Sequence, residues 1–207
     1  MSRSRLLHAA ANVGVASTFL ANLLLSWRPG KLSAWISIIY VVMALLSLVR
    51  AAPREARTDY QAWIALSGMV ILPLLIQLVP RSAALTRPTP AGMAFEAVAV
   101  VFQSSGLVLM QVALLCLGRH FGLLPANRGL VTRGPFRLIR HPVYAAWLVY
   151  AFGTLMIVPT INNLALLALT IPFMVWRINL EEELLDHDPQ YRAYRQRVRW
   201  RLVPGVF

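Results

Sequence analysis

The chain has 207 residues, of which 58% are hydrophobic and only 14% are charged. A soluble domain of this size would need far more polar surface, so the composition favours a membrane protein with spans of about 17–25 residues. The 20 Lys and Arg residues against 8 Asp and Glu residues give a net charge of +12. These cations lie in loops between apolar runs, which favours a membrane surface over nucleic acid as the partner. The single cysteine, Cys116, excludes an intramolecular disulfide and a zinc–thiolate cluster.

Four long apolar runs come first along the chain, and each of them predicts a membrane-spanning helix. They cover about residues 8–26, 32–49, 60–79 and 92–118. No small-residue cleavage pattern clearly follows the first run, so we expect it to remain as a span.

The second part of the chain begins with the longest polar stretch, residues 119–141. Two shorter apolar segments follow at about 143–158 and 164–176, and the sequence PTINN between them predicts a tight turn and hence a helical hairpin. The charged tail contains no span. We therefore predict an all-α polytopic membrane protein with four spans, a C-terminal helical hairpin and a cytoplasmic C-terminal segment. Its two parts would be residues 1–118, which hold the four spans, and residues 119–207, which hold the polar stretch, the hairpin and the charged tail.

Lys and Arg are distributed unevenly between the loops on the two sides of the predicted spans. If the N-terminus is cytoplasmic, sixteen of the 20 Lys and Arg residues fall on the cytoplasmic side and four fall outside. The positive-inside bias therefore predicts a multi-pass integral membrane protein whose N- and C-termini are both cytoplasmic.

Two polar clusters flank the hairpin: RGPFRLIRHPVY at residues 133–144 and RINLEEELLDHD at residues 177–188. An antiparallel hairpin brings its two ends together, so Arg140 and His141 should lie close to the acidic residues 181–183. Five of the eight acidic residues of the chain fall in the second cluster. Because ionisable groups at membrane depth are costly and usually functional, we expect a site at this end of the hairpin.

Arg177 precedes Glu181 by four residues, and on a helix these two side chains share a face. The pair has two interpretations. One is an ordinary exposed ion pair that also serves as a positive-inside stop signal. The other is a cation that a carboxylate holds in a pocket and directs at an anionic group of a substrate.

The sequence RHP has both a functional and a structural interpretation. Pro142 fits the first turn of a helix, so His141 should lie near an N-cap. The free N–H groups and the positive dipole end of a helix N-terminus favour an anionic ligand group. With Arg140 adjacent, RHP predicts a receptor for a carboxylate or a phosphate; the alternative is a capping or interfacial histidine. Arg133 and Arg137 fit the cytoplasmic charge bias alone.

The sequence RGPFRLIRHPVY, the hairpin, RINLEE and the tail YRAYRQRVRWRLVP together resemble the isoprenylcysteine carboxyl methyltransferase family and the related phospholipid N-methyltransferases. The resemblance covers about residues 128–207 and implies an S-adenosyl-L-methionine site facing the cytosol, with a methyl acceptor that arrives from the bilayer. The cofactor-binding residues that it implies are Arg140, His141, Pro142, Tyr144, Glu181 and Glu182. The catalytic residues that it implies are Arg177, near the carboxylate of the acceptor, and Glu181. The position of Arg177 also favours Glu181 and Glu182, over Glu183, as the functional pair.

The chemistry of these residues agrees with the resemblance. S-adenosyl-L-methionine carries a carboxylate, for which Arg140 and the helix start offer a receptor, and amino and hydroxyl groups, for which Glu181 or Glu182 offers acceptors. Methyl transfer is a direct displacement, so the enzyme mainly aligns two partners and excludes water. A carboxylate acceptor needs no base, whereas an amine or thiol would need one, with His141 or a glutamate as the candidate. The four histidines show no metal-ligand spacing, so no metal is expected.

The sequence therefore predicts an S-adenosyl-L-methionine-dependent membrane methyltransferase that acts on a lipophilic small-molecule or lipidated acceptor, with a carboxylate as the favoured methylated group. Two other kinds of acceptor stay open, namely a phospholipid headgroup amine and a small thiol or phenolic lipid. Two alternatives belong to other classes. One is an NADPH-dependent membrane reductase of the sterol type, which shares a similar C-terminal hairpin, and the other is a non-catalytic lipid-binding membrane protein.

Other polar segments also have two interpretations. The basic tail carries Tyr191, Tyr194, Arg195 and Val198 at helical spacing, which favours an amphipathic helix on anionic lipid over a lid on the cofactor pocket. Glutamines inside the predicted spans fit either interhelical hydrogen bonds or contacts with the acceptor. These are Gln77, Gln103 and Gln111.

Overall fold

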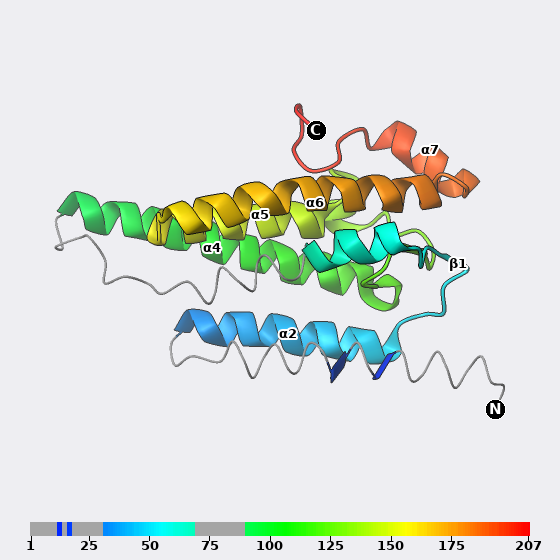
Figure 1. The fold of residues 1–207 in the computed structure, drawn as a ribbon, viewed down its shortest axis with the longest axis horizontal. Coiled ribbons are helices and arrows are strands. Elements are labelled where there is room, and N and C mark those ends of the chain that lie inside the picture. The colour runs from blue at the N-terminus through cyan, green and yellow to red at the C-terminus, as the bar shows by residue number, and fades with distance from the viewer. Residues whose placement is uncertain (1–11, 14–15, 18–30, 69–89) are drawn as a thin grey trace.

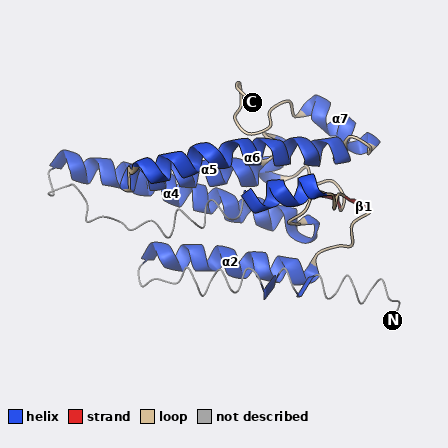
Figure 2. Cartoon of the chain, in the orientation of Figure 1, coloured by secondary structure: helices blue, strands red, loops and turns tan. Residues whose placement is uncertain are grey.

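The computed structural model describes residues 12–13, 16–17, 31–68 and 90–207, and all statements about the fold concern these residues. They are mostly helical, as predicted, with two strands of two residues each (Figure 2). A helical segment at residues 60–68 accompanies the following elements. They are α2 (Lys31–Val49), β1 (Glu55–Ala56), α4 (Pro90–Leu117), η1 (Gly118–His120), β2 (Ala126–Asn127), η2 (Gly134–Arg137), α5 (Pro142–Ile157), α6 (Ile161–Leu185) and α7 (Pro189–Arg197).

The observed helices match several of the predicted spans. Helix α2 coincides with the second predicted span and α4 with the fourth, while α5 and α6 form the predicted hairpin. Among the described residues, Ala94–His120 and Ile161–Leu185 are long and apolar enough to cross a membrane, and α5 is a shorter apolar helix. Most of the first predicted span and the third beyond residue 68 lie outside the described residues. The count of four spans and the cytoplasmic location of the termini therefore stay predictions.

Helix α6 differs from its predicted extent at both ends. It begins at Ile161, where the Thr160 hydroxyl accepts a hydrogen bond from the backbone N–H of Asn163 at 3.2 Å. Most of the sequence PTINN is therefore the first helical turn, because a threonine N-cap starts a helix efficiently. At the other end α6 continues to Leu185, nine residues past the predicted end at Trp176, since leucine, glutamate and arginine are good helix formers. The acidic cluster consequently lies on the same helix as the apolar segment.

Helices α4 and α5 pack closely because glycine occupies their contact. A Cβ atom on Gly106 would lie 2.5 Å from the backbone nitrogen of Tyr150, and one on Gly153 would lie 2.7 Å from the backbone nitrogen of Gln103. The Gln103 side chain donates a hydrogen bond to the Thr154 hydroxyl at 3.0 Å. Gln103 is therefore an interhelical hydrogen-bonding residue. Gln77 lies outside the described residues.

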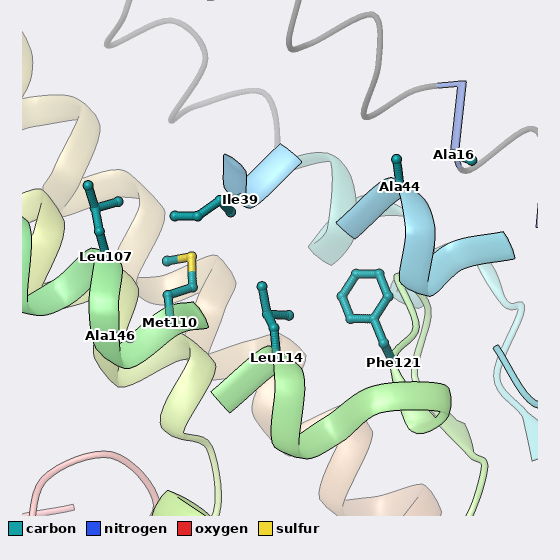
Figure 3. Packing of buried hydrophobic residues seen from close by; sticks show 8 residues of the cluster. All are labelled: Ala16, Ile39, Ala44, Leu107, Met110, Leu114, Phe121 and Ala146. Atoms are coloured by element: carbon teal, nitrogen blue, oxygen red, sulfur yellow. The ribbon is translucent and has the colours of Figure 1, made fainter. Parts of the chain in front are cut away.

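Helix α2 packs against the other face of α4 through an apolar cluster. Figure 3 shows Leu107, Met110 and Leu114 of α4 directed toward α2. Ile39 of α2 and Phe121, just after η1, complete the contact, and Leu114 is fully buried. Close-packed apolar side chains of this kind hold two helices in a defined register. The C-terminal ends of α2, α4 and α6 point to the same end of the molecule, where β1 and α7 also lie (Figure 1).

The loop that follows α2 is tied to the C-terminal part of the chain. Strands β1 and β2 pair in an antiparallel manner. Backbone hydrogen bonds extend this pairing from Ala51 to the Arg119 carbonyl (2.8 Å) and from Arg57 to the Pro125 carbonyl (3.0 Å). The Arg57 side chain reaches α6, where its Nη1 lies 2.5 Å from Glu183. These bonds attach the end of α2 to the polar stretch that precedes α5.

Helix α7 packs onto the protein through its apolar face. Tyr191, Tyr194 and Val198 are buried in one cluster, against Leu130 and Leu185. The Tyr194 hydroxyl donates a hydrogen bond to the backbone carbonyl of Phe136 at 2.7 Å. The interpretation of this segment as a helix whose apolar face lies on lipid is therefore wrong, because tertiary contacts already cover that face. Its arginines remain exposed.

Asp188 caps α7 and gives a pH-dependent prediction. Its carboxylate accepts hydrogen bonds from the backbone N–H of Gln190 (2.9 Å) and from the Asn127 side chain (3.2 Å), which lower the pKa of this carboxyl. Asp188→Ala should destabilise the protein at pH 7 by ~1 kcal/mol. Because folding lowers the pKa, this contribution is present above the unfolded-state pKa of about 4 and is lost as the pH falls through the folded-state value.

The measurement is the thermal midpoint in detergent of both proteins between pH 7 and pH 3. The difference between wild type and Asp188→Ala should shrink toward the acid end. Asp188→Asn serves as the control, since an asparagine also caps a helix, and it should lose much less stability at pH 7. A difference that does not change with pH would contradict the role of the ionised carboxylate.

Candidate functional site

The two ends of the hairpin meet, as predicted, in a buried ionic cluster. Arg140, just before α5, binds Glu182 on the last turns of α6 with its Nε at 2.7 Å and its Nη2 at 3.3 Å. Both side chains are buried. A two-pronged arginine–carboxylate contact is among the strongest and most directional pairs in proteins. It fixes the start of α5 against the end of α6.

Glu182 is shared by three basic side chains and is only 3% exposed. Besides Arg140, His141 approaches it with Nε2 at 3.0 Å, and Arg201 approaches it with Nη2 at 2.9 Å. A buried carboxylate is stable only when charge partners and hydrogen bonds replace its hydration. These three basic side chains therefore make Glu182 the centre of the cluster, and they leave it few free lone pairs.

The same cluster holds the C-terminal tail across the beginning of α5. Arg140 Nη1 donates to the backbone carbonyls of Val198 (2.8 Å) and Arg199 (2.6 Å). The backbone N–H groups of Arg140 and His141 donate to the carbonyls of Trp200 and Arg201, both at 2.9 Å. The Arg140 guanidinium is thus occupied by the protein itself. A cofactor carboxylate that binds Arg140 would have to displace one of these partners.

A second network joins Arg177, Tyr144 and Glu181. The Tyr144 hydroxyl donates to Glu181 Oε2 at 3.1 Å and accepts from Arg177 Nε at 2.7 Å. Arg177 is 4% exposed, its Nη2 donates to the Leu123 carbonyl, and its Nη1 is buried without a hydrogen-bond partner among the described residues. The interpretation of Arg177 as an exposed ion pair is therefore wrong. This side chain is buried, and it reaches Glu181 through the tyrosine.

The structure distinguishes the three consecutive glutamates. Glu181 contacts Tyr144 and Glu182 contacts Arg140, whereas Glu183 points away with 66% of its side chain exposed. A helix turns by 100° per residue, so only two neighbouring residues can face the same network. The geometry agrees with Glu181 and Glu182 as the pair, and Glu183 has a different partner in Arg57.

His141 and Pro142 begin α5 as expected, but the histidine side chain does not cap the helix. Pro142 is buried in the first turn, and His141 occupies the N-cap position without a side-chain cap bond. The imidazole instead faces Glu182 and stacks on the ring of Tyr144, with 5.7 Å between the centroids and 24° between the planes. His141 of the RHP sequence and Tyr144 thus place two stacked rings beside the glutamate pair.

Two basic residues at this end of the molecule were not predicted as site residues. Arg201 lies in a tail with four other arginines of similar sequence context, so only its contact with Glu182 distinguishes it. Arg128 contributed to the prediction only as one of the cations on the cytoplasmic side. Arg133 and Arg137 are exposed, in agreement with their interpretation as surface cations. Among the described residues, no group of three or more His, Cys, Asp and Glu side chains is arranged to hold a metal ion.

Comparisons with known proteins match this part of the chain. The family described as "Phospholipid methyltransferase" matches residues 89–191. "Protein-S-isoprenylcysteine O-methyltransferase A" of Arabidopsis thaliana is 32% identical over 101 residues, 45% of this chain and 51% of that protein. "Protein-S-isoprenylcysteine O-methyltransferase" of Tribolium castaneum is 35% identical over 103 residues, 45% of this chain and 36% of that protein.

A solved structure of a eukaryotic intramembrane Ras methyltransferase, an isoprenylcysteine carboxyl methyltransferase, covers 94% of this chain and 73% of its own chain, at 23% identity and a TM-score of 0.47. The match to the Arabidopsis proteins spans about half of their length. The matched residues include α4, the RHP sequence and the glutamate pair. These sequence matches support assignment of this part of the chain to the isoprenylcysteine carboxyl methyltransferase family.

Proposed function

We propose that this protein is a membrane methyltransferase that transfers the methyl group of S-adenosyl-L-methionine to an anionic group of a lipophilic acceptor. The favoured reaction is O-methylation of a carboxylate, as on the isoprenylated cysteine named for its relatives. The observation that carries the proposal is that RHP, the glutamate pair and Arg177 meet in one cluster of hydrogen bonds and ion pairs. None of these charged groups is needed to pack two apolar helices.

The side chains beside the glutamate pair fit the polar groups of S-adenosyl-L-methionine, which supplies a methyl group on a sulfonium. Among the described residues, Glu181 accepts a hydrogen bond from the Tyr144 hydroxyl alone, so it retains acceptor capacity for an ammonium or a ribose hydroxyl. The stacked rings of His141 and Tyr144 offer an aromatic surface for the adenine. Arg140, Pro142 and Glu182 would then hold these rings, the start of α5 and the tail in place.

Arg177 is the candidate group that binds the acceptor. Its Nη1 is a buried donor with no partner among the described residues, and an unpaired donor on a buried cation is costly. A carboxylate of the acceptor would satisfy this donor and place its oxygen near the cofactor site. Such an oxygen is already ionised at pH 7, so the transfer needs alignment and exclusion of water but no general base.

Exposed apolar side chains support entry of the acceptor from a bilayer. Both long helices present large apolar residues away from the protein, and surfaces of this extent are typical of contact with lipid. On α4 these are Phe95, Val98, Val101, Val108, Val112 and Leu115. On α6 they are Ile161, Leu164, Leu169 and Ile171. An integral membrane location would let the acceptor diffuse laterally toward Arg177.

N-methylation of a phospholipid headgroup is the second candidate, because the matched family is described by that substrate class. An amine acceptor would need a base to remove a proton. His141 is the nearest candidate, but its Nε2 faces Glu182 at 3.0 Å. This engagement makes a carboxylate acceptor the simpler assignment.

The first test of the proposed function measures binding of S-adenosyl-L-methionine to the detergent-solubilised protein, with NADPH as competitor. Binding that NADPH does not reverse is expected, and no binding at millimolar cofactor would contradict the proposal. The second step supplies labelled cofactor and a total lipid extract and identifies the labelled product. A labelled ester indicates carboxyl methylation, whereas a labelled headgroup amine indicates the second candidate.

Arg177→Gln should reduce turnover on a carboxylate acceptor by about 10- to 100-fold, the usual effect of losing a charged hydrogen bond to a substrate. Cofactor affinity should change much less, because the hydrogen bonds of Arg177 within the described residues go to Tyr144 and Leu123 and not to RHP. Steady-state kinetics and equilibrium cofactor binding check this difference. Arg192→Gln, an exposed arginine of α7, is the matched control and should retain wild-type kinetics.

A further inference from the structure

Arg128 is a half-buried cation near the candidate site. It forms no ion pair with any carboxylate of the described residues. It lies between β2 and η2, and its Nε donates to the backbone carbonyl of Ala51 at 3.2 Å. Its guanidinium lies against Gly122, where a Cβ atom would come 2.9 Å from the Arg128 Cζ. Its two Nη atoms have no hydrogen-bond partner among the residues that the structure describes. Most of its hydrogen-bonding capacity is therefore available to a ligand.

The surroundings of Arg128 carry an excess of positive charge. Burial and, to a smaller extent, the positive charge of Arg50 lower the pKa of Arg128 to about 10, while Glu181 acts in the opposite direction. The group stays protonated at pH 7. The neighbouring Glu182 cannot compensate, because three basic side chains already share it. Glu181 is the carboxylate that interacts electrostatically with both Arg128 and Arg177. One carboxylate beside two cations leaves an excess of positive charge, which favours binding of an additional anion.

Arg128 and Arg177 flank the same short segment of backbone. Arg128 packs on Gly122, and Arg177 donates from Nη2 to the carbonyl of the next residue, Leu123. Both guanidinium groups also belong to the electrostatic environment of Glu181. One arginine comes from a loop and the other from α6, so their proximity to one segment is a product of the tertiary fold.

We propose that Arg128 is a second cation of the acceptor site and, together with Arg177, binds the anionic group of the acceptor, a carboxylate or a phosphate. This proposal rests on the proposed function, since it assigns a residue to the same acceptor. A guanidinium group binds such an oxyanion with two parallel hydrogen bonds. Arg177 has one free N–H-bearing nitrogen, Nη1, among the described residues, so a second arginine would supply the remaining donors. Arg128 would thereby select acceptors that carry a negative charge beside the lipid chain.

The experiment compares binding of two ligands that differ only in charge, N-acetyl-S-prenylcysteine and its carboxamide, to protein saturated with S-adenosylhomocysteine. In the wild type the acid should bind more tightly than the amide. Arg128→Gln should weaken binding of the acid by about tenfold, the usual effect of losing one charged hydrogen bond, and leave binding of the amide unchanged. Cofactor affinity should stay at the wild-type value, because the hydrogen bond of Arg128 within the described residues goes to Ala51 and not to RHP or Glu182.

Gly122→Ala provides a second variant that keeps the positive charge. The added methyl group must displace the end of the Arg128 side chain, which is flexible, so the fold should tolerate the change. Like Arg128→Gln, it should weaken binding of the acid and leave binding of the amide unchanged. Arg133→Gln is the matched control, because Arg133 also donates to a backbone carbonyl, that of Cys116, from the same polar stretch. It should change neither affinity.

The outcomes separate this proposal from the proposed function. Equal weakening of acid and amide, or no weakening of either, would show that Arg128 only holds the loop to Ala51, and would overturn the proposal. A wild type that binds acid and amide equally well would also overturn it. Because binding needs no turnover, absence of methyl transfer in the wild type would count against the proposed function alone. A parallel measurement with phosphatidylethanolamine vesicles shows whether a phosphate competes with the acid at Arg128.

Discussion

Replacement of Glu182 by glutamine is expected to cause the largest loss of stability of any single change at the site, together with loss of cofactor binding. The side chain is 3% exposed and lies among Arg140, His141 and Arg201. An amide has nearly the same shape but no charge, so the buried guanidinium of Arg140 would lose its counterion. Removing one partner of a buried ion pair typically costs ~3–5 kcal/mol.

The adjacent glutamate offers a matched control for this prediction. Glu183→Gln removes the same charge one residue further along α6, but its side chain is 66% exposed and its partner is Arg57 near the surface. Exposed ion pairs contribute only ~0–1 kcal/mol. Thermal midpoints in detergent and equilibrium binding of S-adenosyl-L-methionine should therefore differ strongly for Glu182→Gln and little for Glu183→Gln. Similar midpoints for the two variants would contradict the central position of Glu182.

Loss of Glu182 should also release the tail. Arg201 would lose its carboxylate partner, and Arg140, which holds the carbonyls of Val198 and Arg199, would lose the group that fixes its own position. Limited proteolysis in detergent can report this change. Cleavage after the arginines at 197–201 should become faster in Glu182→Gln and stay at the wild-type rate in Glu183→Gln.

The second large effect is expected at the contact of α4 with α5. Gly106→Ala would place a Cβ atom 2.5 Å from the Tyr150 backbone nitrogen, and Gly153→Ala would place one 2.7 Å from the Gln103 backbone nitrogen. Backbone atoms inside a helix cannot move aside individually, so the two helices would have to separate. Overpacking of this kind costs ~1–3 kcal/mol, and it would also disturb the hydrogen bond between Gln103 and Thr154.

The sign of the effect makes this prediction decisive. In an exposed helix interior, Gly→Ala stabilises by ~1 kcal/mol, because alanine has the higher helix propensity. At Gly106 and Gly153 the same change should instead lower the thermal midpoint. Ser105→Ala, at an exposed position beside Gly106, is the control and should have a small effect. A higher midpoint for either glycine variant would show that α4 and α5 are not in close contact.

The sequence predicted the helices of this protein better than their ends. Long apolar runs and the PTINN link correctly indicated α2, α4, α5 and α6, because helix formation in apolar segments is a local property. The apolar run stops at Trp176 and predicts the end of α6 there, but the helix continues to Leu185. Hydrophobicity indicates which residues contact lipid or the core, while helix propensity decides where the backbone stops being helical. In α6 the apolar run therefore ends before the helix does.

The site was predictable where its residues are near the hairpin ends. The proximity of Arg140 and His141 to the glutamate pair follows from hairpin topology. Arg177 lies one helical turn before Glu181 and reaches it through Tyr144, and the function of the glutamate pair stays a prediction. The contribution of Arg201 was not predictable, because five arginines follow one another in the tail with similar neighbours. Which of them reaches Glu182 depends on how α7 and the tail return over α5.

The sequence by itself determined the helical class, the hairpin and the chemical types gathered at its open end, since periodicity, apolar length and charge are local. Only the tertiary structure decided how the charges are shared. It placed Arg140 on Glu182 and on the tail carbonyls and linked Arg177 to Glu181 through Tyr144. It also left Arg128 beside Gly122 without an ion pair to any carboxylate of the described residues. Ion pairing inside a protein depends on distances between segments far apart in the chain, and packing alone sets those distances.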